Sequence, residues 1–214
     1  MTGGPAGGAL YPLRLQQRSA HRSFSAYNEA QRGRPVRPLA RRALESVLPR
    51  EGDALPIAIE LGCGAGIEAQ FLAENGFAVH AIDGDPSVGP HLAALAENHP
   101  VTPVIADLGS LEELPAAELV LSCATLSFVA PEPFARLWSM VREALVPGGV
   151  LAVDLFGDRD DWAGTEGTHP SRAEVDALLE GFEVLALDEE ERDGRSFTGP
   201  KHWHTIQLIA RRSA

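Results

Sequence analysis

From Ile57 onward, short apolar runs alternate with stretches of helical pattern, and this alternation restricts the fold more than any other feature. Runs that are apolar almost throughout are typical of strands covered on both faces, which is the situation in a parallel sheet with helices on either side. The sequence therefore predicts an α/β, Rossmann-like fold. Five such runs are IAIEL (57–61), FAVHAID (77–83), VTPVIAD (101–107), ELVLSC (118–123) and VLAVDLF (150–156).

Two further runs, FEVLALDE (182–189) and HWHTIQLIARR (202–212), are joined by the polar segment 190–201 without a helical pattern. They are expected to pair as an antiparallel hairpin around a loop that overhangs the sheet. This gives a mostly parallel seven-stranded sheet in which only the last strand is reversed. Pro103 marks the third strand as an edge strand, because proline cannot donate to a ladder. Pro147-Gly148-Gly149 predicts a turn into the fifth strand.

Helices are expected between the strands, and two more before them, separated near Pro35. The predicted helices span about 19–32, 37–48, 66–75, 86–98, 131–145 and 171–180. The resulting organisation is a disordered or poorly ordered arm (1–20), a helical segment (21–50) and the main domain (51–214). That division suits a chain of 214 residues.

The charge is strongly acidic overall and unevenly distributed. A net charge of −12 argues against general nucleic-acid binding, although residues 1–50 contain nine Arg and two Glu. That basic segment could meet an anionic substrate or RNA, or it could form solvated helices docked on an acidic domain. Of 18 basic residues only Lys201 is a lysine, a usage typical of genomic base-composition bias.

Two cysteines, Cys63 and Cys123, exclude a disulfide framework, and no Cys/His spacing matches a structural zinc site. A His-x-His metal site at His202 and His204 would need a third ligand such as His169 or Asp154, so no metal is predicted. No apolar run reaches the ~18 residues of a membrane span. The first residues lack the pattern of a secretory signal. A cytoplasmic protein is expected.

The segment Glu60-Leu61-Gly62-Cys63-Gly64-Ala65-Gly66 follows the first strand and opens a helix. Glycines let a backbone press against a ligand, and a helix start offers free N–H groups. A dinucleotide fingerprint needs its third glycine at position 67, which is Ile67 here. The loop instead reads G-x-G-x-G.

Asp83 ends the second strand and Asp107 ends the third, so both should lie beside the glycine loop at one sheet edge. A carboxylate at Asp83 suits the two hydroxyls of a ribose. Asp107 could accept from the exocyclic amine of a purine. Together with the loop they predict a nucleoside site.

These motifs, with LVPGGVL (145–151), resemble those of class I S-adenosylmethionine-dependent methyltransferases, over about residues 33–212. GRPVRPL (33–39) and FTGPKHWH (197–204) further resemble a small bacterial type related to tellurite-resistance methyltransferases. The resemblance implies S-adenosylmethionine as cofactor, an antiparallel strand inserted between strands five and six, and a lid formed by 21–50. It implies cofactor contacts from Glu60, Gly62, Cys63, Gly64, Gly66, Asp83, Gly84, Asp107, Leu108, Ser122 and Cys123.

The acceptor is expected to be a small molecule. Some relatives carry an Asn/Asp-Pro-Pro-Tyr/Phe signature after strand four for methylation of amides or of exocyclic amines in DNA. This chain instead has Ser122-Cys123-Ala124-Thr125-Leu126, which argues against those acceptors. The alternative is methylation of a polymer, RNA or protein, guided by the basic segment.

Acceptor-side residues are expected in three places. His202 and His204 open the last strand on one face, opposite Lys201 and Trp203, and either could be a base or simply a packed strand residue. His169 and Trp162 follow strand five, although His169 could belong to a helix cap. Tyr27 and Arg34 are substrate candidates that could equally be packing residues.

Two other functions remain compatible with the sequence. A nicotinamide-dependent oxidoreductase would share the fold, but Ile67 and LVPGGVL count against it. A non-catalytic module that binds the cofactor and acts through a partner would share the site as well.

Overall fold

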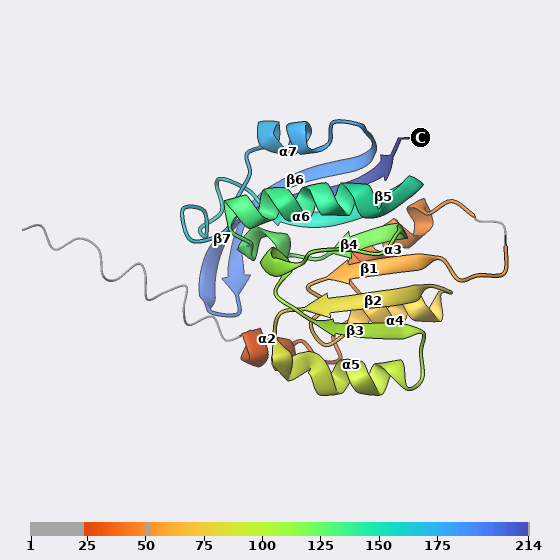
Figure 1. The fold of residues 1–214 in the computed structure, drawn as a ribbon. Helices are drawn as coiled ribbons and strands as arrows, with labels where there is room; N and C mark the ends of the chain where they lie inside the picture. Colours follow the sequence, from red (N-terminus) through yellow and green to blue (C-terminus); the bar gives the residue numbers. More distant parts are fainter. Residues whose placement is uncertain (1–23, 50–51, 214) are drawn as a thin grey trace, which may run out of the picture.

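Seven strands form one sheet in the order β3-β2-β1-β4-β5-β7-β6 (Figure 1). The computed structural model describes residues 24–49 and 52–213. Strands β1 to β5 are parallel, and β7 runs antiparallel to both of its neighbours, β5 and β6. The predicted fold, with its single reversed strand, is confirmed. The strands are β1 (Ile57–Leu61), β2 (Ala78–Asp83), β3 (Val101–Ile105), β4 (Ala117–Ser122), β5 (Leu145–Phe156), β6 (Phe182–Ser196) and β7 (Gly199–Arg212).

Helices cover both faces of the sheet. On one face lie α3 (Pro38–Ser46), α4 (Ile67–Glu74) and α5 (Gly89–Ala96), and on the other α6 (Pro131–Ala144) and α7 (Arg172–Leu178). Short 3₁₀ turns are η1 (Pro86–Val88), η2 (Leu108–Ser110) and η3 (Leu126–Phe128). Each face has its own apolar core, because the strands bury alternate side chains on opposite sides.

Local sequence explains where these helices form. Helix α6 begins with Pro131, which is favoured in a first turn, and it buries Phe134, Leu137, Trp138 and Val141 at helical spacing. Helix α7 begins with a capping box in which Ser171 and Glu174 bond each other's backbone N–H. Strand β3 lies at the sheet edge, as Pro103 predicted.

Residues 147–149 do not form a separate turn before β5, which corrects the prediction made from Pro147-Gly148-Gly149. Strand β5 begins at Leu145, and its pairing with β4 jumps from Ala117↔Leu145 to Leu119↔Val150. Gly148, at φ +81°, lies inside this irregularity. The extra residues bulge out of the ladder while the strand continues.

Residues 190–201 are not a loop, which corrects a second prediction. Strands β6 and β7 pair as far as Ser196↔Gly199 and form a long hairpin. Its charged residues pair across the strands, as His202 does with Glu191 (3.0 Å) and Asp193 (2.7 Å). The hairpin tip descends toward helix α2 (Phe24–Ala30) (Figure 1). There the ring of Phe197 lies 5.9 Å from that of Tyr27.

Helix α2 (Phe24–Ala30) lies within the predicted helix 19–32. The earlier part of that helix and the arm 1–20 fall outside the described residues. Helix α2 buries no residue, whereas α3, predicted over 37–48, buries Leu39, Ala40 and Ala43. In residues 24–49 and 52–213, no helix is long and apolar enough to cross a membrane.

Candidate functional site

The glycine loop bends sharply from the end of β1 across the end of β2. The N–H groups of Gly62 and Cys63 both donate to the carbonyl of Ile82, at 2.8 and 3.1 Å. Gly62, Gly64 and Gly66 have φ values of 77°, 53° and 79°, in the left-handed region that glycine adopts without strain. The spacing G-x-G-x-G therefore follows from the backbone conformation of this turn, which delivers the chain into α4.

Asp83, at the end of β2, is bound directly to this loop. One carboxylate oxygen accepts the N–H of Gly64 at 2.7 Å, and the other accepts the N–H of Asp85 at 2.8 Å. The carboxylate is half-buried. The structure thus brings together the two elements of the predicted nucleoside site, and the ribose contact of Asp83 stays a prediction.

The end of β3 meets the end of β2 at the same edge. A Cβ on Gly84 would lie 3.7 Å from the Cα of Asp107, so these two predicted cofactor residues are neighbours. Asp107 is exposed, and Leu108 is buried where η2 begins. A nucleobase bound here would have the Asp107 carboxylate as a hydrogen-bond acceptor and the apolar side chain of Leu108 nearby.

At the end of β4, the hydroxyl of buried Ser122 donates to the carbonyl of Leu61 at 2.9 Å, which ties β4 to the start of the glycine loop. Ala124 then adopts φ +56° and is the only residue other than glycine with a positive φ among those described. Thr125 lies against the loop, because a Cβ on Gly62 would overlap its side chain. Nothing in the sequence marks Thr125.

Cys63 and Cys123 are both buried free thiols. Burial raises the pKa of each well above its ordinary value, and the nearby carboxylates of Glu60 and Asp154 add to the effect for Cys63 and Cys123 respectively. The thiols are therefore neutral at physiological pH and are poor nucleophiles.

A buried charge network lies beside the loop. Arg34 donates two hydrogen bonds of 2.6 Å to the buried Glu68, whose carboxylate also accepts the N–H of Arg37 at 2.9 Å. Burial alone raises the pKa of Glu68, but the hydrogen bonds from Arg34 and Arg37 outweigh it and lower the pKa. Burial, and then the charge of Glu68, raise the pKa of Glu60 well above its ordinary value. The guanidinium of Arg34 thus binds Glu68 of this chain. Glu68 is a residue of this charge network that the sequence analysis did not single out.

Helix α2 lies across the glycine loop. The Asn28 amide donates to Asp85 at 3.0 Å, and its oxygen would be 3.0 Å from a Cβ on Gly64. Ser25 also donates to Asp85, at 3.1 Å. The Tyr27 hydroxyl accepts from Arg37 at 3.1 Å. Asn28 therefore covers the centre of the site, although it was not among the predicted residues.

The three candidate histidines differ in their surroundings. His204 is fully buried, with Nδ1 accepting the N–H of Arg159 at 3.1 Å and Nε2 2.9 Å from Glu189. His202 lies on the same strand face, where the hydrogen bonds that its ring donates to Asp193 and then to Glu191 raise its pKa. His169 is half-buried in the segment before α7, whose N-cap is Ser171.

Trp162 belongs to an aromatic cluster, defined here as Phe24, Phe128, Phe156, Trp162 and Trp203. Neighbouring rings in it have centroids 5.2 to 5.9 Å apart. The chain's single lysine, Lys201, lies in this cluster with its ammonium 3.5 Å from the Trp203 centroid and 3.8 Å from that of Trp162. It pairs with buried Asp160 at 2.6 Å. A single lysine in a chain whose other basic residues are arginines is a signal for such a buried position, because a compact ammonium fits where a guanidinium would not.

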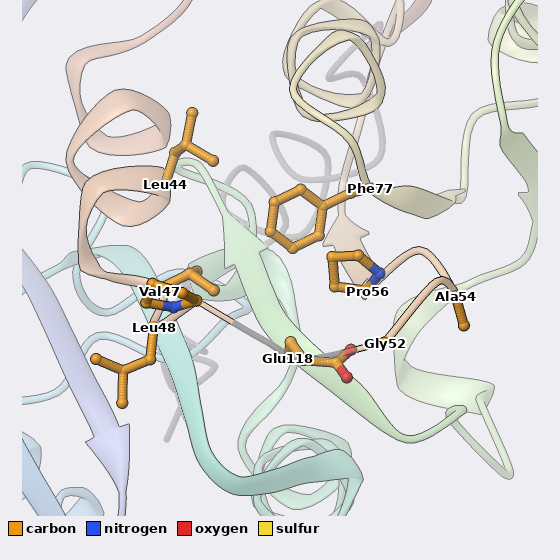
Figure 2. A pocket seen from close by; sticks show the side chains of 9 residues that line it. Leu44, Val47, Leu48, Gly52, Ala54, Pro56, Phe77 and Glu118 are labelled. Atoms are coloured by element: carbon orange, nitrogen blue, oxygen red, sulfur yellow. The ribbon is translucent and has the colours of Figure 1, made fainter.

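A separate cavity of about 270 Å³ lies at the opposite end of the strands (Figure 2). Leu44, Val47, Pro56 and Phe77 form its apolar walls, and Glu118 accepts the N–H of Ile57 at 2.7 Å beside it. Since Ile57 starts β1 and Gly62 follows its end, this cavity does not belong to the nucleoside site.

Residues 58–149 match the model of a protein family described as a methyltransferase domain. The matched range includes the glycine loop, Asp83, Asp107 and the bulged segment at the start of β5. No curated protein matches the chain in sequence.

Solved structures of methyltransferases have a similar fold. TehB from Haemophilus influenzae is 15% identical with a TM-score of 0.73, over 89% of this chain and 67% of TehB. The N-methyltransferase NodS from Bradyrhizobium japonicum WM9, in complex with S-adenosyl-L-homocysteine, is 17% identical with a TM-score of 0.62, over 94% and 97% of the two chains. The 1,6-didemethyltoxoflavin-N1-methyltransferase of Burkholderia thailandensis is 17% identical with a TM-score of 0.60, over 98% and 94%.

Proposed function

We propose that this chain is a class I S-adenosylmethionine-dependent methyltransferase and that it transfers a methyl group from S-adenosylmethionine to a small-molecule acceptor. The match of residues 58–149 to a methyltransferase domain and the similar fold of solved methyltransferases support this proposal. The observation that carries the proposal is the 2.7 Å hydrogen bond from Gly64 N–H to the carboxylate of Asp83. It joins a turn of three left-handed glycines to an acidic strand end, in the arrangement expected around an amino-acid-bearing nucleoside.

The residues present fit this cofactor. Glu60 is 1% exposed, and its Oε2 finds no hydrogen-bond partner among the described residues, so the site offers an acceptor for the ammonium of the cofactor's amino acid. Gly62, Gly64 and Gly66 would line that part, and Asp83 would bind the ribose hydroxyls. Asp107 would meet the adenine amine.

Bound S-adenosylmethionine supplies a methyl group on a positively charged sulfur, which leaves as a neutral thioether. The protein's task is then mainly to align an acceptor behind the methyl, and such positioning contributes on the order of 7–11 kcal/mol. A general base is needed only for an acceptor that holds its proton. His204 is unsuited to that role in this arrangement, because both ring nitrogens bond protein groups.

The acidic charge of the chain supports a small acceptor over a nucleic acid. Asn28 of α2, which lies over Gly64, would also limit the space for an acceptor.

Calorimetry with S-adenosylhomocysteine and with NAD tests the cofactor, and formation of S-adenosylhomocysteine over an acceptor panel tests turnover. We expect binding of S-adenosylhomocysteine and none of NAD. Binding of NAD alone would refute the proposal. Cofactor binding without turnover on any acceptor would favour the non-catalytic alternative.

A further inference from the structure

Aromatic side chains concentrate at one end of this molecule. The chain has eight Phe, three Trp and two Tyr. Five of them form the aromatic cluster, and Tyr27 and Phe197 form an adjoining pair with centroids 5.9 Å apart. These seven come from α2, η3, the end of β5, the segment after β5, the hairpin tip and β7. Residues so distant in sequence meet here through the tertiary fold, in a protein with 6% aromatic residues.

The aromatic cluster lies next to the proposed cofactor site. Phe24 and Asn28 are four residues apart on α2, and thus about 6 Å apart along the helix axis. Asn28 lies over Gly64, while the Phe24 ring is 5.4 Å from that of Phe128. On the other side, Thr125 lies against Gly62 and directly precedes η3, which carries Phe128.

The cluster is partly open to solvent. Phe128, Trp162 and Trp203 are half-buried, and the two large side chains at its margin, Phe24 and Phe197, are 43% and 57% exposed. Binding pockets are typically lined by aromatic side chains with few polar groups, and offset or edge contacts between rings add to the area they bury.

The charge of Lys201 within the cluster affects which aromatic ligands the cluster can bind. The Lys201 ammonium lies against Trp162, Trp203 and Phe156, at 3.8, 3.5 and 4.6 Å from their centroids. Ring faces that already contact this ammonium, which is paired with Asp160, are less available to a second cation, so the cluster favours a neutral aromatic ligand. A positively charged sulfur on the bound cofactor would act in the same direction.

We propose that the aromatic cluster binds the methyl acceptor and that this acceptor is a planar, electron-rich aromatic molecule, of the class of phenols or aromatic thiols. This inference rests on the proposed function and adds the substrate class. Trp162 and Phe128 supply the ring contacts. Lys201 and Asp160 hold Trp162 in position, because Lys201 lies against its ring and Asp160 accepts its backbone N–H at 3.0 Å.

Calorimetry on the full chain saturated with S-adenosylhomocysteine tests this inference without requiring turnover. The probes are 2-naphthol and catechol, each paired with its ring-saturated counterpart, decahydro-2-naphthol and cyclohexane-1,2-diol. N-methylquinolinium is the planar cationic control. We expect each aromatic probe to bind about tenfold more tightly than its saturated counterpart, and more tightly than the cation.

Three variants locate the binding. Trp162→Leu and Phe128→Leu should each weaken 2-naphthol about tenfold and leave the affinity for S-adenosylhomocysteine within about twofold. Phe71→Leu, in a half-buried aromatic residue of α4, is the matched control and should change neither. Equal binding of aromatic and saturated probes, or unchanged binding by both cluster variants, would overturn the inference while the cofactor site stands. Failure of the wild-type chain to bind S-adenosylhomocysteine would overturn the proposed function as well.

Discussion

The carboxylate of Asp83 accepts the backbone N–H of Gly64 at 2.7 Å, across 19 residues of sequence. This bond joins the end of β2 to the centre of the glycine loop, and the second carboxylate oxygen is used by Asp85 N–H at 2.8 Å. One side chain therefore fixes the loop and supplies its negative charge.

Replacing Asp83 with Asn should reduce S-adenosylhomocysteine affinity by about tenfold or more. The amide keeps one oxygen acceptor but turns an NH₂ group toward one of the two N–H donors, and it removes the charge that would bind the ribose hydroxyls. Calorimetry measures the loss. Asp53→Asn, an exposed residue before β1, serves as control. Unaltered affinity in Asp83→Asn would contradict the assignment of the site.

Gly62→Ala should destabilise the protein more than Gly76→Ala. Both glycines have positive φ, at 77° and 90°, so both variants incur backbone strain of order 1 kcal/mol. A Cβ on Gly62 would in addition overlap Thr125, whereas no atom lies within 4 Å of a Cβ on Gly76. Urea unfolding of both variants gives the comparison. Equal losses would mean that Thr125 does not constrain the loop.

Lys201→Met should lower the free energy of unfolding by about 3–5 kcal/mol, because it leaves the buried Asp160 carboxylate without its counter-charge. Lys201 and Asp160 side chains are 2% and 0% exposed and 2.6 Å apart. The double variant Lys201→Met with Asp160→Asn should recover part of the loss, and chemical denaturation of the four proteins measures the coupling. Additive effects would show that the pair does not act as a unit.

The carboxyl group of Glu189 should titrate far below the usual range. Hydrogen bonds from Arg159 and then from His204 lower its pKa from 4.5 to about 2. Because the folded-state pKa is depressed, the stabilising contribution is present above about pH 4.5 and is lost as the pH falls toward about 2. Carbon-detected NMR of the Glu189 carboxyl measures the midpoint.

Arg159→Ala should move that midpoint up toward 4.5, since it removes the first of the two hydrogen bonds. Arg192→Ala, which removes the partner of Glu190 at 3.1 Å, should leave it in place. A wild-type midpoint near 4.5 would argue that the pairing of Glu189 with Arg159 and His204 does not persist in solution.

Much of the fold follows from patterns within short segments. Apolar runs specified the strands, the Pro103 signal placed β3 at the edge, and the glycine loop and Asp83 were recognisable because strand ends of a parallel sheet meet at one edge. The full length of the β6–β7 hairpin could not be predicted from the sequence, because residues 190–201 are polar and lack a strand pattern. Their pairing depends on cross-strand contacts such as His202 with Asp193, which no local pattern records.

The sequence by itself therefore determined the strand order along the chain, the glycine turn and the acidic strand ends, because each depends on conformational preferences or periodicity of neighbouring residues. Only the tertiary structure decided that Asn28 covers Gly64, that Thr125 lies against Gly62, and that Lys201 is surrounded by Phe156, Trp162 and Trp203. These contacts join segments far apart in the chain, and their partners are fixed by how helices and strands pack in three dimensions.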